Sequence, residues 1–423
     1  MKVLIIGAGG REHALAYKMA QSTEVDAVFV APGNAGTALE SKVSNVDINP
    51  FDFMALARFA KNERISLTVV GPETPLADGL VDFFVSQDLP CFGPCKAAAQ
   101  LEASKVFSKE FMTRCNIPTA KYQNFKEIQA AKAYVREQGT PIVIKASGLA
   151  GGKGVVVAQT EEEAFTTIEN FLNHATLGLA GSEIVIEEFL EGEEASFIVM
   201  SDGQHVVPLA SSQDHKARDD GDRGPNTGGM GAYSPAPVVT PTLHDEIMKR
   251  VIQPVIDEMR NMGHPYIGFL YAGIMITNDQ KINVLEFNCR LGDPEAQPLL
   301  MRLKSDLYVH CKAALAGNLD TQTFIWDPRP ALGVVMAMEE YPAHSKTEEL
   351  ITLPQSISED CKIFHAGTVQ TDQGIITHGG RILCVTALGN DIKDAQQRVY
   401  AVVKQVHWDH CHYRTDIGYR AIM

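Results

Sequence analysis

The chain has 423 residues, 45% of them hydrophobic and 21% charged, as expected of a globular protein with roughly three domains. Its formal net charge of −15 argues against broad nucleic-acid binding, because such binding needs a basic surface to neutralise phosphates. No run approaches the ~18 apolar residues of a membrane helix. We therefore expect small-molecule partners, and neither nucleic acid nor a membrane.

The cysteines and the first residues bear on the compartment. The eight cysteines form no CxxC pair and show no His/Cys spacing typical of zinc, which favours reduced thiols. The apolar part of the opening MKVLIIGAGG is too short for the core of a signal peptide. We therefore expect a cytoplasmic protein.

Short apolar runs alternate with helical patterns over the first hundred residues. The runs at Val3–Ile6, Ala27–Val30 and Leu67–Val70 predict strands, and Arg11–Ala20 and Phe51–Lys61 predict helices. Strands that alternate with helices form parallel sheets covered on both faces. The fold class is therefore α/β at the N-terminus, with an open parallel sheet.

Each of these strands is followed by a Gly/Pro loop: GAGGREH, PGNAGT and GPETPL. Ligands of open α/β sheets bind outside the carboxyl ends of the strands, where such loops gather. A dinucleotide fingerprint fails, because Glu12 occupies its third glycine position and no acid follows the second strand. A glycine turn that opens a helix beside Arg11 suits a single phosphate instead. A purely structural turn is the alternative.

The stretch VIKASGLAGGKGVVV, from Val143 to Val157, predicts a β-hairpin with a glycine-rich tip. It is not a P-loop, because Lys153 is followed by Gly154 rather than Ser or Thr, and then by a strand. Backbone N–H groups at glycines, together with Lys145 and Lys153, can neutralise a polyphosphate. The alternative is a solvated flexible turn.

A second predicted hairpin joins GFLYAGIMI (268–276) to INVLEFNCR (282–290). Glu286 and Asn288 lie two residues apart on a strand and so face the same side. Such oxygen ligands suit Mg²⁺, which binds few protein groups and relies on substrate phosphates. Arg290 is expected next to them.

The patterns in the rest of the chain predict a mixture of helices and strands. Helices are expected at 104–120, 125–138, 161–173, 240–262 and about 391–405, and strands at 183–190, 332–338 and 380–389. We divide the chain into three domains. They are residues 1–103, residues 104–326 with a mobile subdomain of about 120–190, and residues 327–423.

These motifs together resemble the ATP-grasp superfamily and, within it, the glycinamide ribonucleotide synthetase family. The resemblance rests on GAGGREHALA, PGNAGT, GPE, QDHK, GPNTGGMGAYSPAP, EFNCRLGDPEAQP and DIGYRA, in the family's order. It implies an N-terminal open parallel α/β sheet, a two-part nucleotide-binding fold and a small mixed C-terminal domain. It also implies a ligase that joins glycine to 5-phosphoribosylamine through glycyl phosphate in purine biosynthesis, with ATP as co-substrate and Mg²⁺ or Mn²⁺ as metal.

The resemblance assigns roles to individual residues. For ATP they are Lys105, Lys145, Lys153, Gly152, Glu187, Glu188, Leu190 and Glu194. For phosphoribosylamine they are Gly9, Gly10, Arg11, Asn34, Gly36 and Glu73. For glycine they are Asp214, Arg290, Gly292 and Asp293, of which Arg290, Asp293 and Asp214 are catalytic. Glu286 and Asn288 would bind the metal.

The chain departs from the family pattern at a few positions. Ser147 replaces Asp and Gly151 replaces Ala in the hairpin, Ala217 replaces the Arg of DHKR, and Leu291 replaces Phe. No predicted metal ligand or ATP lysine is lost. Another ATP-grasp purine-pathway ligase or carboxylase, an NAD dehydrogenase and a catalytically dead nucleotide-binding module stay open as alternatives. We expect a monomer.

Overall fold

The computed structural model describes residues 1–151, 154–173, 176–343 and 348–422. Its N-terminal part is the predicted parallel sheet, in the order β3-β2-β1-β4-β5. The strands are β1 (Lys2–Gly7), β2 (Ala27–Pro32), β3 (Val43–Asn45), β4 (Leu67–Val70) and β5 (Cys91–Phe92). The three predicted strands are thus confirmed, whereas the short edge strands β3 and β5 gave no signal.

Helices cover both faces of this sheet. They are α1 (Gly10–Ala20), α2 (Phe53–Glu63), α3 (Glu73–Asp78) and α4 (Leu80–Ser86), with the 3₁₀ turn η1 (Thr37–Leu39). The predicted helices at 11–20 and 51–61 correspond to α1 and α2. Because α1 and α3 begin directly after β1 and β4, their N-termini lie at the carboxyl edge of the sheet.

The predicted helix over 104–120 is shorter than expected. After α5 (Gln100–Ala103), α6 runs from Lys105 to Arg114 with Ser104 as its N-cap. The helix ends early because Asn116 adopts a left-handed conformation with φ of 54°, a common way for a helix to stop. The first residue of α6, Lys105, is held beside the hairpin by its N–H, which donates to the Ser147 carbonyl at 2.9 Å.

A small subdomain follows and contains the predicted glycine-tipped hairpin. Its sheet has the order β6-β9-β7-β8, and α7 and α8 pack on it. The elements are β6 (Tyr122–Phe125), α7 (Ile128–Gln138), β7 (Ile142–Ala146), β8 (Val155–Ala158), α8 (Glu161–Leu172), the turn η2 (Gly178–Gly181) and β9 (Ile184–Glu188). β7 and β8 pair antiparallel, which confirms the hairpin.

The central sheet has the order β11-β10-β16-β17. Its strands are β10 (Gly192–Asp202), β11 (Val206–Pro208), β16 (Ile267–Thr277) and β17 (Ile282–Asn288). The hairpin of β16 and β17 was predicted, but the long strand β10 was not. The predicted helical stretch 240–262 is α9 (Pro241–Ile247), the π-helical turn η3 (Met248–Ile252) and α10 (Gln253–Asn261).

The C-terminal sheet draws strands from distant parts of the chain. Its order is β12-β15-β18-β22-β19, with β23 also paired to β18. Its strands are β12 (Gln213–Asp214), β15 (Gly231–Ser234), β18 (Ala331–Met338), β19 (Cys361–His365), β22 (Arg381–Leu388) and β23 (Cys411–His412). Residues 231–234 of β15 pair with residues 331–334 of β18, so the middle of the chain is part of this sheet.

The other elements complete the packing. They are the hairpins β13 (Ala217–Asp219) with β14 (Arg223–Asn226) and β20 (Thr368–Thr371) with β21 (Gly374–Thr377), the helices α11 (Ala296–Arg302), α12 (Leu307–Leu315), α13 (Ile392–Val403) and α14 (Tyr419–Ile422), and the turn η4 (Leu319–Thr321). The predicted helix near 391–405 is α13. Across the part of the chain that the structure describes, every helix is too short or too polar to cross a bilayer.

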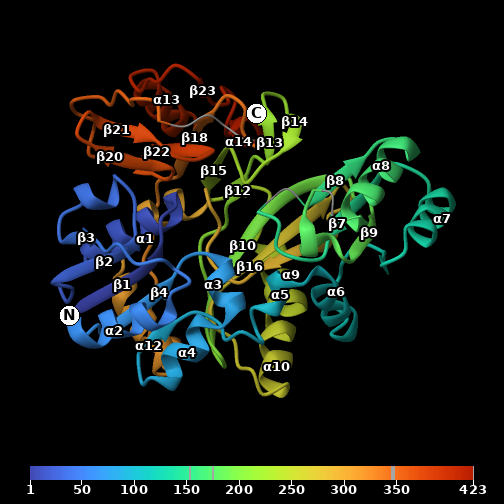
Figure 1. The fold of residues 1–423 in the computed structure, drawn as a ribbon, viewed down its shortest axis with the longest axis horizontal. Coiled ribbons are helices and arrows are strands. Elements are labelled where there is room, and N and C mark those ends of the chain that lie inside the picture. Colours follow the sequence, from blue (N-terminus) through green and yellow to red (C-terminus); the bar gives the residue numbers. More distant parts are fainter. Residues whose placement is uncertain (152–153, 174–175, 344–347, 423) are drawn as a thin grey trace.

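Figure 1 shows how these parts are arranged around β10 and β16. The blue N-terminal sheet lies on one side, and the subdomain with β7, β8, α7 and α8 lies on the other. The red C-terminal sheet lies above the N-terminal sheet in this view. Loops and strand ends from all of these parts therefore converge on the middle of the molecule.

Candidate active site

A cavity of about 300 Å³ lies where these parts meet. It brings together most of the predicted site residues: Arg11, Glu73, Lys105, Lys145, Glu187, Asp214, Glu286, Asn288, Arg290, Gly292 and Asp293. A second cavity of about 210 Å³ adjoins it and is lined by Lys145, Glu187, Glu188, Leu190 and Glu194, among others. Residues from all three predicted domains thus line one continuous site.

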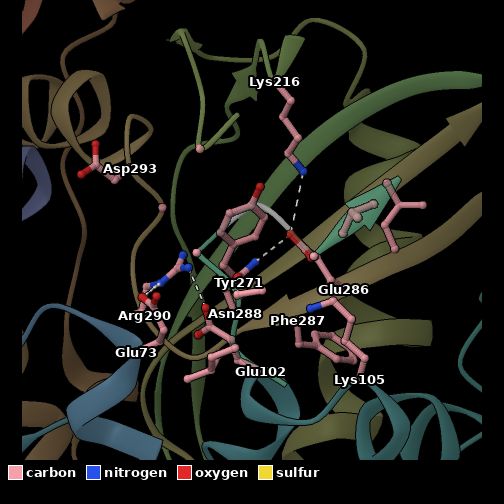
Figure 2. Close-up of a pocket in the computed structure, with 18 of the residues that line it drawn as sticks. Glu73, Glu102, Lys105, Lys216, Tyr271, Glu286, Phe287, Asn288, Arg290 and Asp293 are labelled. Carbon is pink, nitrogen blue, oxygen red and sulfur yellow. Dashed lines mark hydrogen bonds and ion pairs between the residues drawn. The ribbon is translucent and has the colours of Figure 1, made fainter. Parts of the chain in front are cut away.

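The predicted metal ligands project from β17 into the cavity (Figure 2). The Asn288 amide lies 3.5 Å from Oε1 of Glu286, and the Lys216 ammonium lies 3.8 Å from the same oxygen. Burial alone would raise the pKa of Glu286, but Lys216, Lys105 and Lys145 lower it to about 2. The carboxylate is therefore ionised, close to cations, and not tightly paired with any of them.

This donor set fits a hard divalent cation. The described residues contain no group of three or more His, Cys, Asp or Glu side chains able to hold a metal. A cation here would therefore have Glu286, Asn288 and substrate phosphates as ligands. Mg²⁺ typically binds in this way, through one or two protein oxygens.

The lysine side of the cavity contains a buried charge triad. Glu187 lies between two lysines, with Lys145 Nζ 3.1 Å from Oε1 and Lys109 Nζ 3.0 Å from Oε2. Lys145 also donates to the carbonyl of Leu285, and Lys109 to the hydroxyl of Thr119. Burial lowers the pKa of Lys109 to about 8, although Glu187 opposes the shift. The predicted residues Gly152 and Lys153 lie outside the described residues.

Asp214 offers an unpaired acceptor on the opposite wall. Its Oδ1 is inaccessible to solvent and has no hydrogen-bond partner among the described residues. Burial, and then repulsion from Glu295, raise the pKa of Asp214 well above its usual range. Glu295 is itself buried and accepts a hydrogen bond from Ser196 at 2.9 Å. A buried carboxylate without a hydrogen-bond partner destabilises the folded protein, so this wall suits a cationic ligand.

Arg290 lies just beyond the end of β17 and is held by two carboxylates (Figure 2). Its Nε lies 3.2 Å from Glu73, and its terminal nitrogen lies 2.6 Å from Glu102. Burial would raise the pKa of Glu73, but Arg290 and Arg11 lower it to about 2. In this structure the Arg290 guanidinium is therefore directed at protein carboxylates.

Asp293 joins the N-terminus of α1 to the rest of the site. Its carboxylate accepts hydrogen bonds from Gln297 at 2.9 Å and from the Arg11 N–H at 3.4 Å. It also lies 3.6 Å from Arg381. The N–H of Gly9 donates to Glu12 at 2.6 Å. Two N–H groups at the start of this helix, those of Gly9 and Arg11, are thus partnered by carboxylates.

Four of the predicted phosphoribosylamine residues, Gly9, Gly10, Asn34 and Gly36, lie off the cavity wall. Asn34 is buried and donates to the carbonyls of Ala8 and His365, while its oxygen accepts from the Gly36 N–H. A side chain at Gly36 would collide with His13 and His365. Both residues therefore shape their loop. Gly10, inside α1, faces Gln297 and does not line the cavity.

Several lining residues were not predicted from the sequence. They are Glu102, Lys109, Lys216, Tyr271, Glu295, Tyr341 and Arg381. Lys216 and Glu295 belong to motifs that were recognised, QDHK and RLGDPE, so their positions were open to prediction. Tyr341 and Arg381 come from the C-terminal sheet and had no local signal.

Three family models match almost the whole chain. They describe the N domain (residues 1–102), the ATP-grasp (A) domain (103–296) and the C domain (331–420) of phosphoribosylglycinamide synthetase. The chain belongs to this family. The predicted resemblance is therefore confirmed, and the dehydrogenase alternative is removed.

Full-length relatives agree with the family assignment. The phosphoribosylamine–glycine ligase of Vibrio parahaemolyticus is 57% identical over 423 residues, and that of Escherichia coli O157:H7 is 58% identical over 424. In both cases the match covers 100% of this chain and 99% of the relative. The crystal structure of the Thermotoga maritima ligase has a TM-score of 0.84 at 31% identity, covering 99% of this chain and 100% of that one.

A more distant neighbour shows the fold alone. The biotin carboxylase domain of the Hydrogenobacter thermophilus 2-oxoglutarate carboxylase has a TM-score of 0.76 at 16% identity, and the match covers 97% of this chain and 91% of that one. Together with the ATP-grasp family model, it confirms the predicted fold class.

Proposed function

We propose that the protein joins glycine to 5-phosphoribosylamine with hydrolysis of ATP, giving glycinamide ribonucleotide, ADP and phosphate. This is a step of de novo purine synthesis. The observation that carries the proposal is a single cavity, in a chain of this family, that contains two ATP-side lysines, an oxygen pair for a divalent cation and an unpaired acidic wall.

The chemistry requires anionic groups to approach one another. A glycine carboxylate oxygen attacks the γ-phosphorus of ATP, and the bond to ADP breaks. The amine nitrogen then attacks the acyl carbon, phosphate leaves with the C–O electron pair, and the nitrogen loses a proton. Such a reaction depends on positioning and electrostatic stabilisation more than on a protein nucleophile.

The lysine wall and β17 serve the phosphates. Lys105 and Lys145 neutralise the triphosphate, and Lys145 is oriented by Glu187 and the Leu285 carbonyl. Glu286 and Asn288 hold Mg²⁺ or Mn²⁺, which screens the phosphate charges when bound. Glu188 to Leu190 and Glu194 line the adjoining cavity for the nucleoside.

The opposite wall serves the two substrates that are joined. Asp214 receives the glycine ammonium, since its Oδ1 has no protein partner among the described residues. Arg290 and Gly292 also line this cavity. Arg11 and Glu73 face phosphoribosylamine, and the loops of Gly9, Asn34 and Gly36 shape that end. Asp293 bridges the two substrate regions through Arg11 and Arg381.

A coupled assay for ADP tests the proposal. We expect rapid ADP release when glycine, phosphoribosylamine, ATP and a divalent cation are all present. Omitting glycine or phosphoribosylamine should leave at most slow release. Lys145→Met should abolish the rapid release, and Lys121→Met, on an exposed residue, is the control. ADP release that requires bicarbonate or formate in place of glycine would favour another ATP-grasp ligase or carboxylase.

A further inference from the structure

Two side chains of the C-terminal sheet reach the cavity although their part of the chain has no assigned role in the reaction. Arg381 begins β22, and Tyr341 follows β18. Both line the cavity with the predicted substrate residues. Arg381 lies 88 residues along the chain from Asp293 and Tyr341 lies 48, so only the tertiary fold places them there.

Arg381 fastens two loops of the site together. Its NH1 nitrogen donates to the carbonyl of Gly228 at 2.7 Å and to that of Asp293 at 2.5 Å, with a longer contact to Gly229 at 3.4 Å. Its NH2 nitrogen lies 3.6 Å from the Asp293 carboxylate. One guanidinium thus connects the glycine turn 228–229 to the loop of Asp293.

The glycine turn lies between the C-terminal sheet and Asp214. On one side, Tyr341 accepts a hydrogen bond from the Gly228 N–H at 2.9 Å. On the other side, a Cβ placed on Gly229 would lie 2.8 Å from Oδ1 of Asp214 and 2.4 Å from Pro294. Gly229 also has a φ of 111°, which disfavours other residues. The turn therefore fits closely against the unpaired carboxylate.

We propose that Arg381, assisted by Tyr341, is a positioning residue for the glycine subsite. It fixes the turn 228–229 and the loop of Asp293 so that the Asp214 carboxylate is aimed into the cavity. The inference rests on the proposed function, because it deepens the assignment of Asp214 to the glycine ammonium. It makes the C-terminal sheet a part of the substrate site.

The requirement for arginine follows from its geometry. A guanidinium offers several donors in a fixed plane and can reach the carbonyls of both loops at once, whereas a lysine ammonium is a point charge on a flexible stem. Arg381 is only 22% exposed and its carbonyl partners are in adjacent loops. We therefore expect Lys at this position to keep the charge but lose the function.

Steady-state kinetics of the full chain test this role. For Arg381→Gln and Arg381→Lys we expect the KM for glycine to rise about 10-fold or more, since losing a charge-assisted hydrogen bond costs about a decade of binding. The KM for ATP should stay within about 2-fold, because the lysine wall is untouched. Arg398→Gln, a partly exposed arginine on the same domain that pairs with Asp360 and Asp394, is the matched control.

Tyr341→Phe keeps the inference testable if the arginine variants do not fold. It removes only the acceptor for the Gly228 N–H, and we expect a rise of about 3- to 10-fold in the KM for glycine. An unchanged KM for glycine in Arg381→Gln or Tyr341→Phe would overturn the proposal, as would full rescue by Arg381→Lys. Equal shifts for ATP and glycine with a lower melting temperature would mean a purely structural role. A wild-type enzyme that ignores glycine would instead overturn the proposed function.

Discussion

Single side chains set the charge balance of the cavity. Acidic and basic groups alternate around it, so that Glu286 faces Lys216, Glu187 lies between Lys109 and Lys145, and Arg290 is held by Glu73 and Glu102. Because charges interact strongly in such partly desolvated sites, removing one of them changes its neighbours. Glu286 and Lys109 each give a prediction that can be tested independently.

Glu286 is the proposed carboxylate ligand of the metal. Glu286→Gln keeps the shape of the side chain but removes its charge, so we expect kcat/KM for ATP to fall about 100-fold or more at moderate Mg²⁺. The melting temperature should change little, because Glu286 forms no tight ion pair. Glu110→Gln, on the exposed side of α6, is the control. Normal turnover of Glu286→Gln at limiting Mg²⁺ would remove Glu286 from the metal site.

Lys109 should make stability depend on pH. The pKa of Lys109 is lowered from 10.5 to about 8, and burial of the ammonium is the largest cause of this shift. Between these values the unfolded chain holds a proton that the folded chain has lost, so folding stability rises with pH. The free energy of unfolding of the wild type, relative to that of Lys109→Met, should thus rise by up to about 1.4 kcal/mol per pH unit across this window. Below the window this difference should not change with pH. Urea unfolding from pH 7 to 10 measures this.

The exposed Lys121→Met variant is the control for that series, since it should show no such window. A constant difference between wild type and Lys109→Met from pH 7 to 10 would contradict the prediction. Neither Lys109 nor its partner Thr119 could be picked from the sequence. Each is an ordinary residue of a helix or a loop until the tertiary fold brings Thr119 and Glu187 to the Lys109 ammonium.

At the scale of elements, the hairpin β7–β8 and helix α6 act together. The Ser147 carbonyl accepts from the Lys105 N–H at 2.9 Å, and its hydroxyl lies 3.4 Å from the Val106 N–H. The end of the hairpin strand therefore contacts the N-terminus of the helix that begins with Lys105, a predicted ATP ligand. This contact also gives a physical account of the departure at position 147, where the family usually has Asp.

Restoring that acid should be tolerated. An anion at a helix N-terminus is favourable by about 0.3–1 kcal/mol, so we expect Ser147→Asp to be slightly more stable in urea unfolding. We expect kcat/KM for ATP within about 3-fold of the wild type, because the new carboxylate bonds to N–H groups of α6 rather than repelling phosphate. Ser147→Asn isolates the effect of charge from that of shape. A loss of more than 10-fold specific to Asp would mean that position 147 faces the triphosphate.

Helices and strands with a strong local pattern of apolar residues were predictable from the sequence. Short strands that form only by pairing with distant strands were not. The buried strands β1, β2 and β4 and the two hairpins have continuous apolar runs or a turn between them, so their periodicity sufficed. β3, β5 and β12 have two or three residues each, and their pairing is decided by distant partners. The end of α6 was misjudged because the left-handed Asn116 stops the helix before residue 120.

For the whole molecule, the site depends on the way the three parts interlock. The predicted residues that line the cavity were found through the resemblance to the family, and Lys145, Glu286 and Asn288 also through the two predicted hairpins. Arg381 and Tyr341 were missed because their proximity depends on β15 pairing with β18, about a hundred residues further on. The predicted boundaries near residues 103 and 326 stay predictions, but the C-terminal sheet clearly includes β12 and β15.

This interlocking predicts that the C-terminal part cannot be removed. A chain that ends at residue 326 loses β18, so β15 keeps only the two-residue strand β12 as a partner and the fully buried Met230 and Tyr233 become exposed. Exposing such side chains costs about 1.5–3 kcal/mol each, and β12, which carries Asp214, is then paired only with this weakened strand. We expect no cooperative melting transition and no glycine-dependent ADP release. Co-expression with residues 327–423 should restore both, whereas a fragment 1–326 that melts cooperatively and uses glycine would show that the C-terminal sheet is dispensable.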